Sequence, residues 1–221
     1  LLIVLILSVN AASALYNAYD SSTNTWRNTT YSNAVKYPTG EILIQNKLTD
    51  YYDFWTFDES SGTVLDMNIT SNLPLTIVGG TRSTTSFYGN SLSLNGLNGQ
   101  YASPGYGLDW TSGDFTMSAW LKSVGYPVAD SGFGGRRSYV TGNGYVVHFL
   151  INGGMDINTN EDERTAVTGS FPSDSAWHQL TVIKSGTTGY FYVDNVLKSS
   201  SGIILTSWDS GGSTQRFEIG T

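Results

Sequence analysis

Short runs of alternating apolar and polar residues, separated by clusters of Gly, Asn, Asp and Ser, constrain the fold of this chain most strongly. The run 115–121 carries Phe, Met, Ala and Leu at every second position, and the run 145–151 carries Tyr, Val, Phe and Ile in the same way. A period of two places alternate side chains on one face of a strand. No sustained helical period occurs after residue 49. The pattern predicts an all-β protein built as an antiparallel β-sandwich.

The clearest turn signal joins two short apolar runs, residues 190–193 and 196–197. Asp194 and Asn195 lie between them, and both residue types tolerate positive φ. A type I′ turn of two residues requires positive φ at both central positions. We therefore predict a tight β-hairpin at this point.

The first 14 residues have the pattern of a secretory signal peptide. The apolar run Leu1–Leu7 is followed by Ala12-Ser13-Ala14, a cleavage site of the small-x-small type. The apolar run is shorter than the roughly 20 helical residues that cross a bilayer. We predict cleavage after Ala14 and a secreted or cell-surface protein, which is not an integral membrane protein unless the apolar segment is retained. A retained anchor or the hydrophobic stem of a pilin-like subunit is the alternative interpretation.

Residues 15–48 are polar and rich in Asn, Ser and Thr, and the alternating runs begin after them. The sequence thus divides into a leader over residues 1–14, a polar extension over 15–48 and one β-sandwich domain over 49–221. N-glycosylation sequons begin at Asn28 and Asn68, and both are compatible with export.

Charge and composition exclude several function classes. The net charge is −7, with 18 acidic and 11 basic residues, and Arg136-Arg137 is the only adjacent basic pair. Nucleic acid is therefore not an expected partner, because a phosphate backbone is met by clustered Lys and Arg. The chain has no Cys, which excludes disulfides, a thiolate nucleophile and Cys-ligated zinc.

Catalytic patterns are also lacking. Retaining glycosidases need two carboxyl groups about 5 to 5.5 Å apart, and the chain has no Glu-x-Asp-x-x-Glu pattern on a strand. We interpret Glu161–Glu163 as a solvated loop, and the adjacent Asp58 and Glu59 point to opposite faces of a strand end. The two histidines are His148, expected to face solvent or the second layer, and His178, expected to be structural. We predict that the protein is not an enzyme, with a polysaccharide hydrolase as the less favoured alternative.

Several segments, in order, resemble laminin-G-like domains of the concanavalin A-like lectin and glucanase superfamily. They are Phe54–Gly62, Ser91–Gly96, Gly113–Leu121, Trp177–Val182 with Gly189–Asp194, and Phe217–Gly220. The resemblance covers residues 50–221 and implies a jelly-roll sandwich. It also implies further strands after Gly220, so that the domain in this sequence is incomplete at its C-terminus. Structural roles for Trp55, Trp120 and Trp177 are implied as well.

The resemblance implies a recognition or adhesion module that binds carbohydrate or an extracellular protein ligand. Sugars stack their C–H faces on exposed aromatic rings, and Tyr101 and Tyr106, in the loop expected over 99–107, and Trp208 are the candidate rings. The Gly-rich segment 123–137 is predicted to be a recognition loop. The alternative is a structural subunit of a surface filament or layer with a retained hydrophobic N-terminus.

Calcium is the one cofactor that the resemblance implies, at the rim of the sandwich. Calcium takes oxygen ligands from Asp, Asn and backbone carbonyl groups, and Asp58 and Asp66 are the expected ligands. The competing interpretation makes Asp66 a turn residue and Asp58 the end of a strand.

Overall fold

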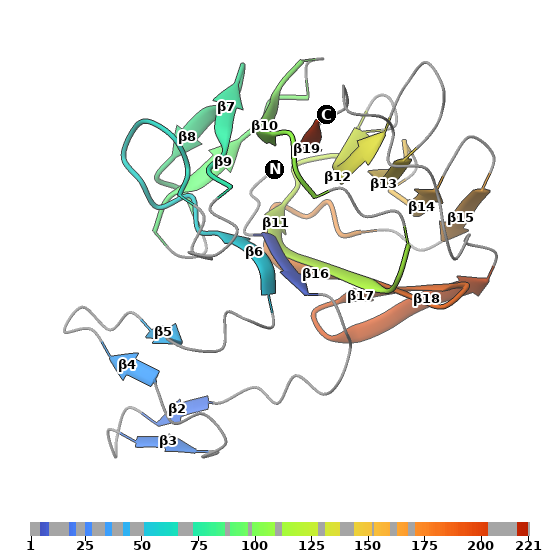
Figure 1. Ribbon diagram of the computed structural model, residues 1–221, viewed down its shortest axis with the longest axis horizontal. Coiled ribbons are helices and arrows are strands. Elements are labelled where there is room, and N and C mark those ends of the chain that lie inside the picture. The colour runs from blue at the N-terminus through green and yellow to red at the C-terminus, as the bar shows by residue number, and fades with distance from the viewer. Residues whose placement is uncertain are drawn as a thin grey trace.

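The computed structural model describes residues 5–8, 18–20, 25–27, 34–36, 42–44, 51–65, 73–86, 89–96, 99–108, 112–127, 131–137, 144–151, 153–159, 163–167, 171–202 and 216–220 (Figure 1). These residues contain no helix. The strands are β1 (Leu5–Ser8), β2 (Ala18–Asp20), β3 (Thr25–Arg27), β4 (Ala34–Lys36), β5 (Ile42–Ile44), β6 (Tyr51–Trp55), β7 (Thr76–Val78), β8 (Thr81–Ser83), β9 (Ser91–Ser93), β10 (Tyr101–Gly105), β11 (Phe115–Lys122), β12 (Ser131–Arg137), β13 (Gly144–Phe149), β14 (Met155–Thr159), β15 (Glu163–Val167), β16 (Trp177–Ser185), β17 (Thr188–Val193), β18 (Val196–Gly202) and β19 (Phe217–Ile219).

Two large antiparallel sheets form the body of the protein. The six-stranded sheet has the order β18-β17-β16-β11-β1-β6, and the seven-stranded sheet has the order β15-β14-β13-β12-β19-β10-β7. The pairs β2–β3, β4–β5 and β8–β9 are separate two-stranded sheets (Figure 1). The predicted all-β, antiparallel sandwich is confirmed.

The core lies between the inner faces of the two sheets. The Trp55 and Phe217 rings, one from each sheet, stack with centroids 6.2 Å apart, and the Phe115 and Tyr145 rings lie 5.7 Å apart. The predicted alternation along β11 is confirmed, because its apolar residues at every second position are buried in this core. The alternation predicted for 145–151 ends early, since Ile151 lies in the turn after β13 and is exposed.

Trp55 has the structural role that the sequence suggested. Its ring is fully buried, and its indole Nε1–H donates a hydrogen bond to the Leu73 carbonyl oxygen at 2.8 Å. Trp120 and Trp177 were expected to act in the same way but are only half-buried and lie outside the core cluster. Trp120 alternates with the buried residues of β11, so the pleat turns it to the outer face of the six-stranded sheet.

The predicted β17–β18 hairpin is confirmed. Asp194 has φ of 51° and Asn195 has φ of 62°, and the flanking residues Val193 and Val196 pair across the turn. Both central residues are in the left-handed region, as a type I′ turn demands.

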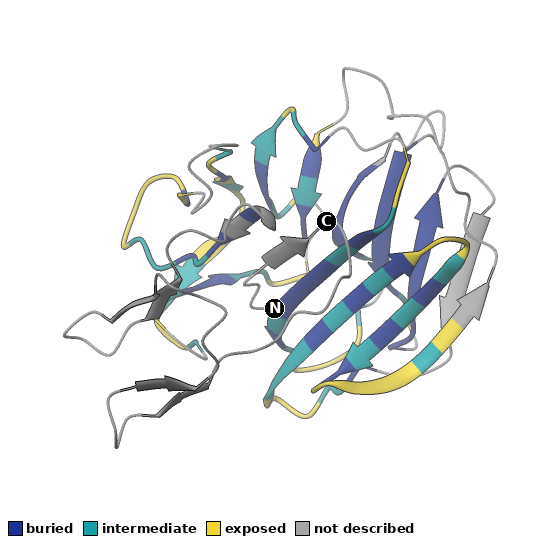
Figure 2. Ribbon diagram, turned by 60° about the horizontal axis from the view of Figure 1, so that its bottom comes forward, coloured by how far each residue is buried: buried dark blue, intermediate teal, exposed yellow. Residues whose placement is uncertain are grey.

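The two sheets differ in how their outer faces are covered. Strands β16 and β17 alternate between buried and half-buried residues, whereas every residue of β13 and β14 is buried (Figure 2). The outer face of the seven-stranded sheet is therefore covered over β13 and β14. Toward β19 and β10 the same face reaches solvent, because Tyr101 and Glu218 are half-buried.

Strand β1 comes from the segment that the sequence predicts to be a leader. Its backbone pairs with β11 on one side and with β6 on the other. Cleavage after Ala14 stays a prediction, as do the boundaries at residues 14 and 48. Within the described residues, no helix has the length and apolar character needed to cross a membrane.

Candidate functional site

Tyr101 opens strand β10 and faces away from the core. Its neighbour Ala102 is fully buried in the core and pairs with Ile219 of β19, so the pleat directs Tyr101 to the outer face of the seven-stranded sheet. The expectation of a loop over residues 99–107 was wrong for residues 101–105, which form a strand. A strand holds the tyrosine ring more rigidly than a loop would.

Two charged residues accompany Tyr101 on this face. Arg216 donates a hydrogen bond from Nη1 to the Tyr101 hydroxyl oxygen at 3.1 Å. Glu218 lies between the core residues Phe217 and Ile219, so its side chain also points outward. We call Tyr101, Arg216 and Glu218 the outer-face cluster.

Burial raises the pKa of Glu218, and the nearby Arg216 guanidinium opposes that rise. The Glu218 carboxyl therefore takes up a proton at higher pH than an exposed glutamate does. In its charged form it accepts hydrogen bonds only, and in its neutral form it also donates one. Together with the Tyr101 hydroxyl and the Arg216 guanidinium, the cluster offers both donors and acceptors beside an aromatic ring.

Strand β12 next to the cluster carries glycines on the outer face. Gly135 pairs with Glu218 on one side and with Val146 on the other. Gly132, farther along β12, pairs with His148. Glycine inside a strand marks a place where backbone or a ligand approaches closely. The prediction of a recognition loop over 123–137 was wrong for residues 131–137, because they form this interior strand.

Beyond β12, the outer face carries a buried polar row. His148 Nδ1 lies 2.8 Å from Asp156 Oδ1, and both side chains are almost fully buried. The His148 side chain therefore lies on the outer face of the sheet, away from the core, but it is covered from solvent. Asn158 is also fully buried, and in the described part of the chain its amide has no hydrogen-bond partner.

Among the described residues, the two carboxyl groups placed on this face do not have a glycosidase arrangement. Glu218 lies on β19 and Asp156 on β14, three strands apart in the sheet order. At about 4.8 Å per strand this is roughly 14 Å, well beyond the roughly 5 to 9.5 Å that retaining and inverting enzymes use. This pair cannot flank one glycosidic bond.

Of the other two predicted rings, the structure describes Tyr106 only. Tyr106 is 62% exposed and follows the end of β10, where Gly105 pairs with Phe217 of β19, so its backbone runs beside Arg216. Trp208 lies outside the described residues, and so do the sequons at Asn28 and Asn68. Within the described residues, Tyr101 is the predicted ring that hydrogen-bonds to the cluster.

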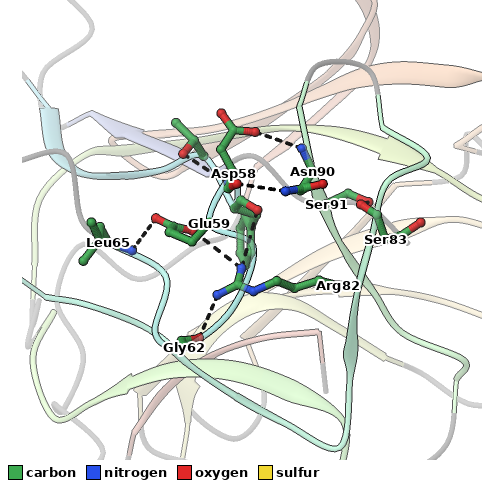
Figure 3. A network of polar contacts seen from close by, with 10 residues as sticks. Asp58, Glu59, Gly62, Leu65, Arg82, Ser83, Asn90 and Ser91 are labelled. Carbon is green, nitrogen blue, oxygen red and sulfur yellow. Dashed lines mark hydrogen bonds and ion pairs between the residues drawn. The ribbon is translucent and has the colours of Figure 1, made fainter.

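Asp58 connects the segment after β6 to the start of β9 (Figure 3). Its Oδ1 accepts a hydrogen bond from the Asn90 backbone N–H at 2.9 Å, and its carbonyl oxygen accepts one from Asn90 Nδ2 at 2.8 Å. Gly89 lies against the carboxylate, and a Cβ there would be 2.6 Å from Asp58 Cγ. The Asp58 carboxylate thus joins two segments far apart in the sequence.

Glu59 and Arg82 stabilise the same region (Figure 3). Glu59 Oε1 accepts a hydrogen bond from the Leu65 backbone N–H at 2.7 Å. The other carboxylate oxygen, Oε2, lies 3.5 Å from Arg82 Nη1. Arg82 Nη2 also donates to the Gly62 carbonyl oxygen at 2.7 Å. These contacts fix the chain between β6 and β8.

The calcium expectation stays a prediction. Within the described ranges, no group of three or more His, Asp or Glu side chains could hold a metal ion. Asp66 lies outside those ranges. The contacts of Asp58 therefore give no support to a calcium site in the described part of the protein.

His178 forms a second polar cluster at the β17–β18 turn. Its Nδ1 lies 2.6 Å from Asp194 Oδ2, and its Nε2 lies 3.1 Å from Asp174 Oδ1. The hydrogen bond to Asp194 is the main cause of a raised His178 pKa, burial opposes the rise, and Asp174 adds to it. The predicted structural role of His178 fits these contacts, since both ring nitrogens hold chain segments together.

Sequence reasoning missed Arg216 and Glu218. The alternation of Phe217 and Ile219 was a usable signal for Glu218, because it places the residue between them on the opposite face. Nothing local marks Arg216, whose contact with Tyr101 joins residues 115 positions apart.

Two solved structures resemble this chain at low sequence identity. Domain 4 of AbnA, an extracellular GH43 arabinanase from Geobacillus stearothermophilus solved with arabinotriose, has a TM-score of 0.54 and 17% identity, covering 70% of this chain and 76% of that domain. The carbohydrate-binding module CBM66 from Bacillus subtilis has a TM-score of 0.40 and 13% identity, covering 66% of this chain and 86% of the module. At 17% identity, the likeness to the arabinanase domain shows the fold alone. No curated protein matches the chain.

The family profile described as the concanavalin A-like lectin/glucanases superfamily matches residues 95–221. This span is more than half of the chain and includes β10 to β19 with the outer-face cluster. The chain belongs to the concanavalin A-like lectin/glucanases superfamily.

Proposed function

We propose that the protein is a non-catalytic carbohydrate-binding module that acts outside the cell and holds a neutral glycan against the outer-face cluster. The observation that carries the proposal is the half-buried Tyr101 ring beside Arg216 and Glu218, on the sheet face opposite the core. A ring supplies a surface for sugar C–H groups, and the charged pair supplies hydrogen bonds to hydroxyls.

Two further observations support the proposal. The arabinanase domain of the same fold was solved with arabinotriose, and the apolar Leu1–Leu7 run resembles a secretory leader. The net charge of −7 favours neutral over polyanionic glycans.

The test is a glycan array followed by calorimetry with arabinotriose and the trisaccharides of xylan, mannan, galactan and β-glucan. We expect one neutral class to bind and heparin not to bind. Tyr101→Ala should weaken binding at least about tenfold, which corresponds to about 1.4 kcal/mol. Glu218→Gln should weaken it less than Glu218→Ala, because an amide keeps a donor and an acceptor.

Val196→Ala is the control, since it removes an exposed apolar side chain from β18 in the other sheet. Equal binding by wild type and Tyr101→Ala would overturn the assignment of the site. A folded wild-type protein that binds no glycan would overturn the function. Repeating the array in calcium and in chelator tests the proposed calcium dependence separately.

A further inference from the structure

Three exposed apolar side chains gather at one end of the sandwich. Val124 is 83% exposed, Tyr126 is 44% exposed and Ile151 is 59% exposed. The first two lie between β11 and β12, and Ile151 lies in the turn between β13 and β14. We call these three residues the rim platform.

The Tyr126 ring rests on a glycine. A Cβ at Gly153 would lie 2.6 Å from Tyr126 Cζ and would overlap the neighbouring ring carbon, so only glycine leaves space for the ring. Gly153 also has φ of 79°, in the region that side chains other than glycine rarely adopt. The ring therefore packs on backbone on one side, while almost half of the residue remains exposed to solvent.

Backbone hydrogen bonds hold the rim platform in place. A hydrogen bond from the Gly153 N–H to the Leu150 carbonyl oxygen closes the turn between β13 and β14. The Phe171 N–H donates a hydrogen bond to the Gly153 carbonyl oxygen at 2.9 Å. Ser175 N–H donates to the Ser123 carbonyl oxygen at 3.0 Å. Three segments that are separate in the sequence thus form one support for the ring.

Carboxylates border this end of the molecule. Asp174, next to the Ser175–Ser123 hydrogen bond, is exposed, and it contacts His178, which also contacts Asp194. Asp174 and Asp194 keep solvent-accessible oxygens, with side chains 58% and 47% exposed. An exposed ring with carboxylate acceptors nearby suits a polyhydroxylated ligand.

We propose that the rim platform is a second carbohydrate contact, at which a sugar ring of a long neutral glycan stacks on Tyr126. This inference rests on the proposed function. A protein partner fits less well, since standard protein interfaces use roughly 20 to 30 residues a side, and the platform has three apolar side chains. Two contacts on one glycan chain raise the affinity for a polymer without improving the binding of a trisaccharide.

The experiment compares each neutral polysaccharide, arabinan, xylan, mannan, galactan and β-glucan, with its own trisaccharide. We expect Tyr126→Ala to weaken binding of the polymer at least about tenfold while changing trisaccharide binding less than about twofold. Tyr126→Phe should keep wild-type binding, because stacking needs the ring. Gly153→Ala should act like Tyr126→Ala, because its Cβ displaces a ring that is still present. Val196→Ala removes an exposed apolar residue elsewhere and is the control.

The outcomes separate this inference from the proposed function. Wild-type polymer affinity in Tyr126→Ala, with trisaccharide binding still lost in Tyr101→Ala, would overturn the rim platform alone. Loss of polymer binding in Tyr126→Ala but not in Val196→Ala, with an unchanged melting temperature, would support it. No binding to any polymer or trisaccharide by the wild type would overturn both.

Discussion

His178 shows how one residue can make stability depend on pH. Its two ring nitrogens contact carboxylates of Asp194 and Asp174, an arrangement in which the protonated imidazole donates to both. Its pKa is raised above the ordinary value of 6.5. A group whose pKa is raised on folding contributes stability that is fully present below its unfolded pKa and is lost as pH rises through its folded pKa.

We therefore expect His178→Gln to destabilise the protein at about pH 5.5 and to cost much less at about pH 9. Urea unfolding of both proteins at the two pH values measures the difference. Asp174 has a lowered pKa because the Ala176 N–H and then His178 bond to it, so its contribution is lost at acid pH. A cost for His178→Gln that is the same at both pH values would contradict the ion-pair account.

Gly89 offers a second test at the scale of single residues. Its φ is 61°, and a Cβ would overlap the Asp58 carboxylate. We expect Gly89→Ala to destabilise the protein by about 1 to 3 kcal/mol, through both backbone strain and overlap. Gly62→Ala is the matched control, because Gly62 has φ of 77° with nothing within 4 Å of a Cβ.

The difference between Gly89→Ala and Gly62→Ala isolates the contact with Asp58. Chemical denaturation gives both values. Equal costs at the two glycines would show that backbone strain alone decides the effect and that the Asp58 contact with the segment before β9 is loose.

At the scale of elements, the β17–β18 turn lacks the residue that its conformation favours most at the second central position. Asn195 occupies the second central position with φ of 62°, where glycine is the preferred residue of a type I′ turn. We expect Asn195→Gly to raise stability by about 0.5 to 1 kcal/mol and Asn195→Ala to lower it by about 1 kcal/mol. Thermal and urea unfolding would check both values, and a stabilising alanine would contradict the turn assignment.

Strand β1 links the predicted leader to the six-stranded sheet. It pairs with both β6 and β11, so cleavage after Ala14 removes a partner from each. In a protein that begins at Leu15 we expect faster hydrogen exchange at residues 116–118 of β11, compared with the full sequence. Residues 190–192 of β17, which pair with β16 on one side and β18 on the other, are the internal control. Unchanged exchange at 116–118 would contradict the pairing of β1.

At the scale of the whole molecule, Trp55 joins the two sheets. It stacks on Phe217 of the opposite sheet and bonds to Leu73. We expect Trp55→Ala to cost about 3 to 5 kcal/mol and to shift the unfolding of both sheets together. Trp120→Ala removes the same side chain from a half-buried site and should cost less. Equal losses of stability for Trp55→Ala and Trp120→Ala in chemical denaturation would contradict the expectation that burial sets the cost.

The local sequence determined the elements of this protein. Alternation along residues 115–121 fixes which face of β11 is buried, and Asp194-Asn195 fixes the turn, because both features depend on neighbours along the chain. The same local rule turns Trp120 outward, although the family resemblance implied a structural role for it. It also turns Glu218 outward, in a position that alternation alone would have revealed.

Only the tertiary structure decided which residues meet. Arg216 reaches Tyr101 because β19 lies beside β10 in the sheet, although 115 positions separate them in the sequence. Tyr126 finds its place on Gly153 because a loop from one sheet folds over a turn of the other. The alternation of side chains along a strand and the conformation of a turn depend on adjacent residues. The order of the strands depends on burying the inner faces of both sheets in one core. The sites therefore follow from the order of the strands, which no single segment contains.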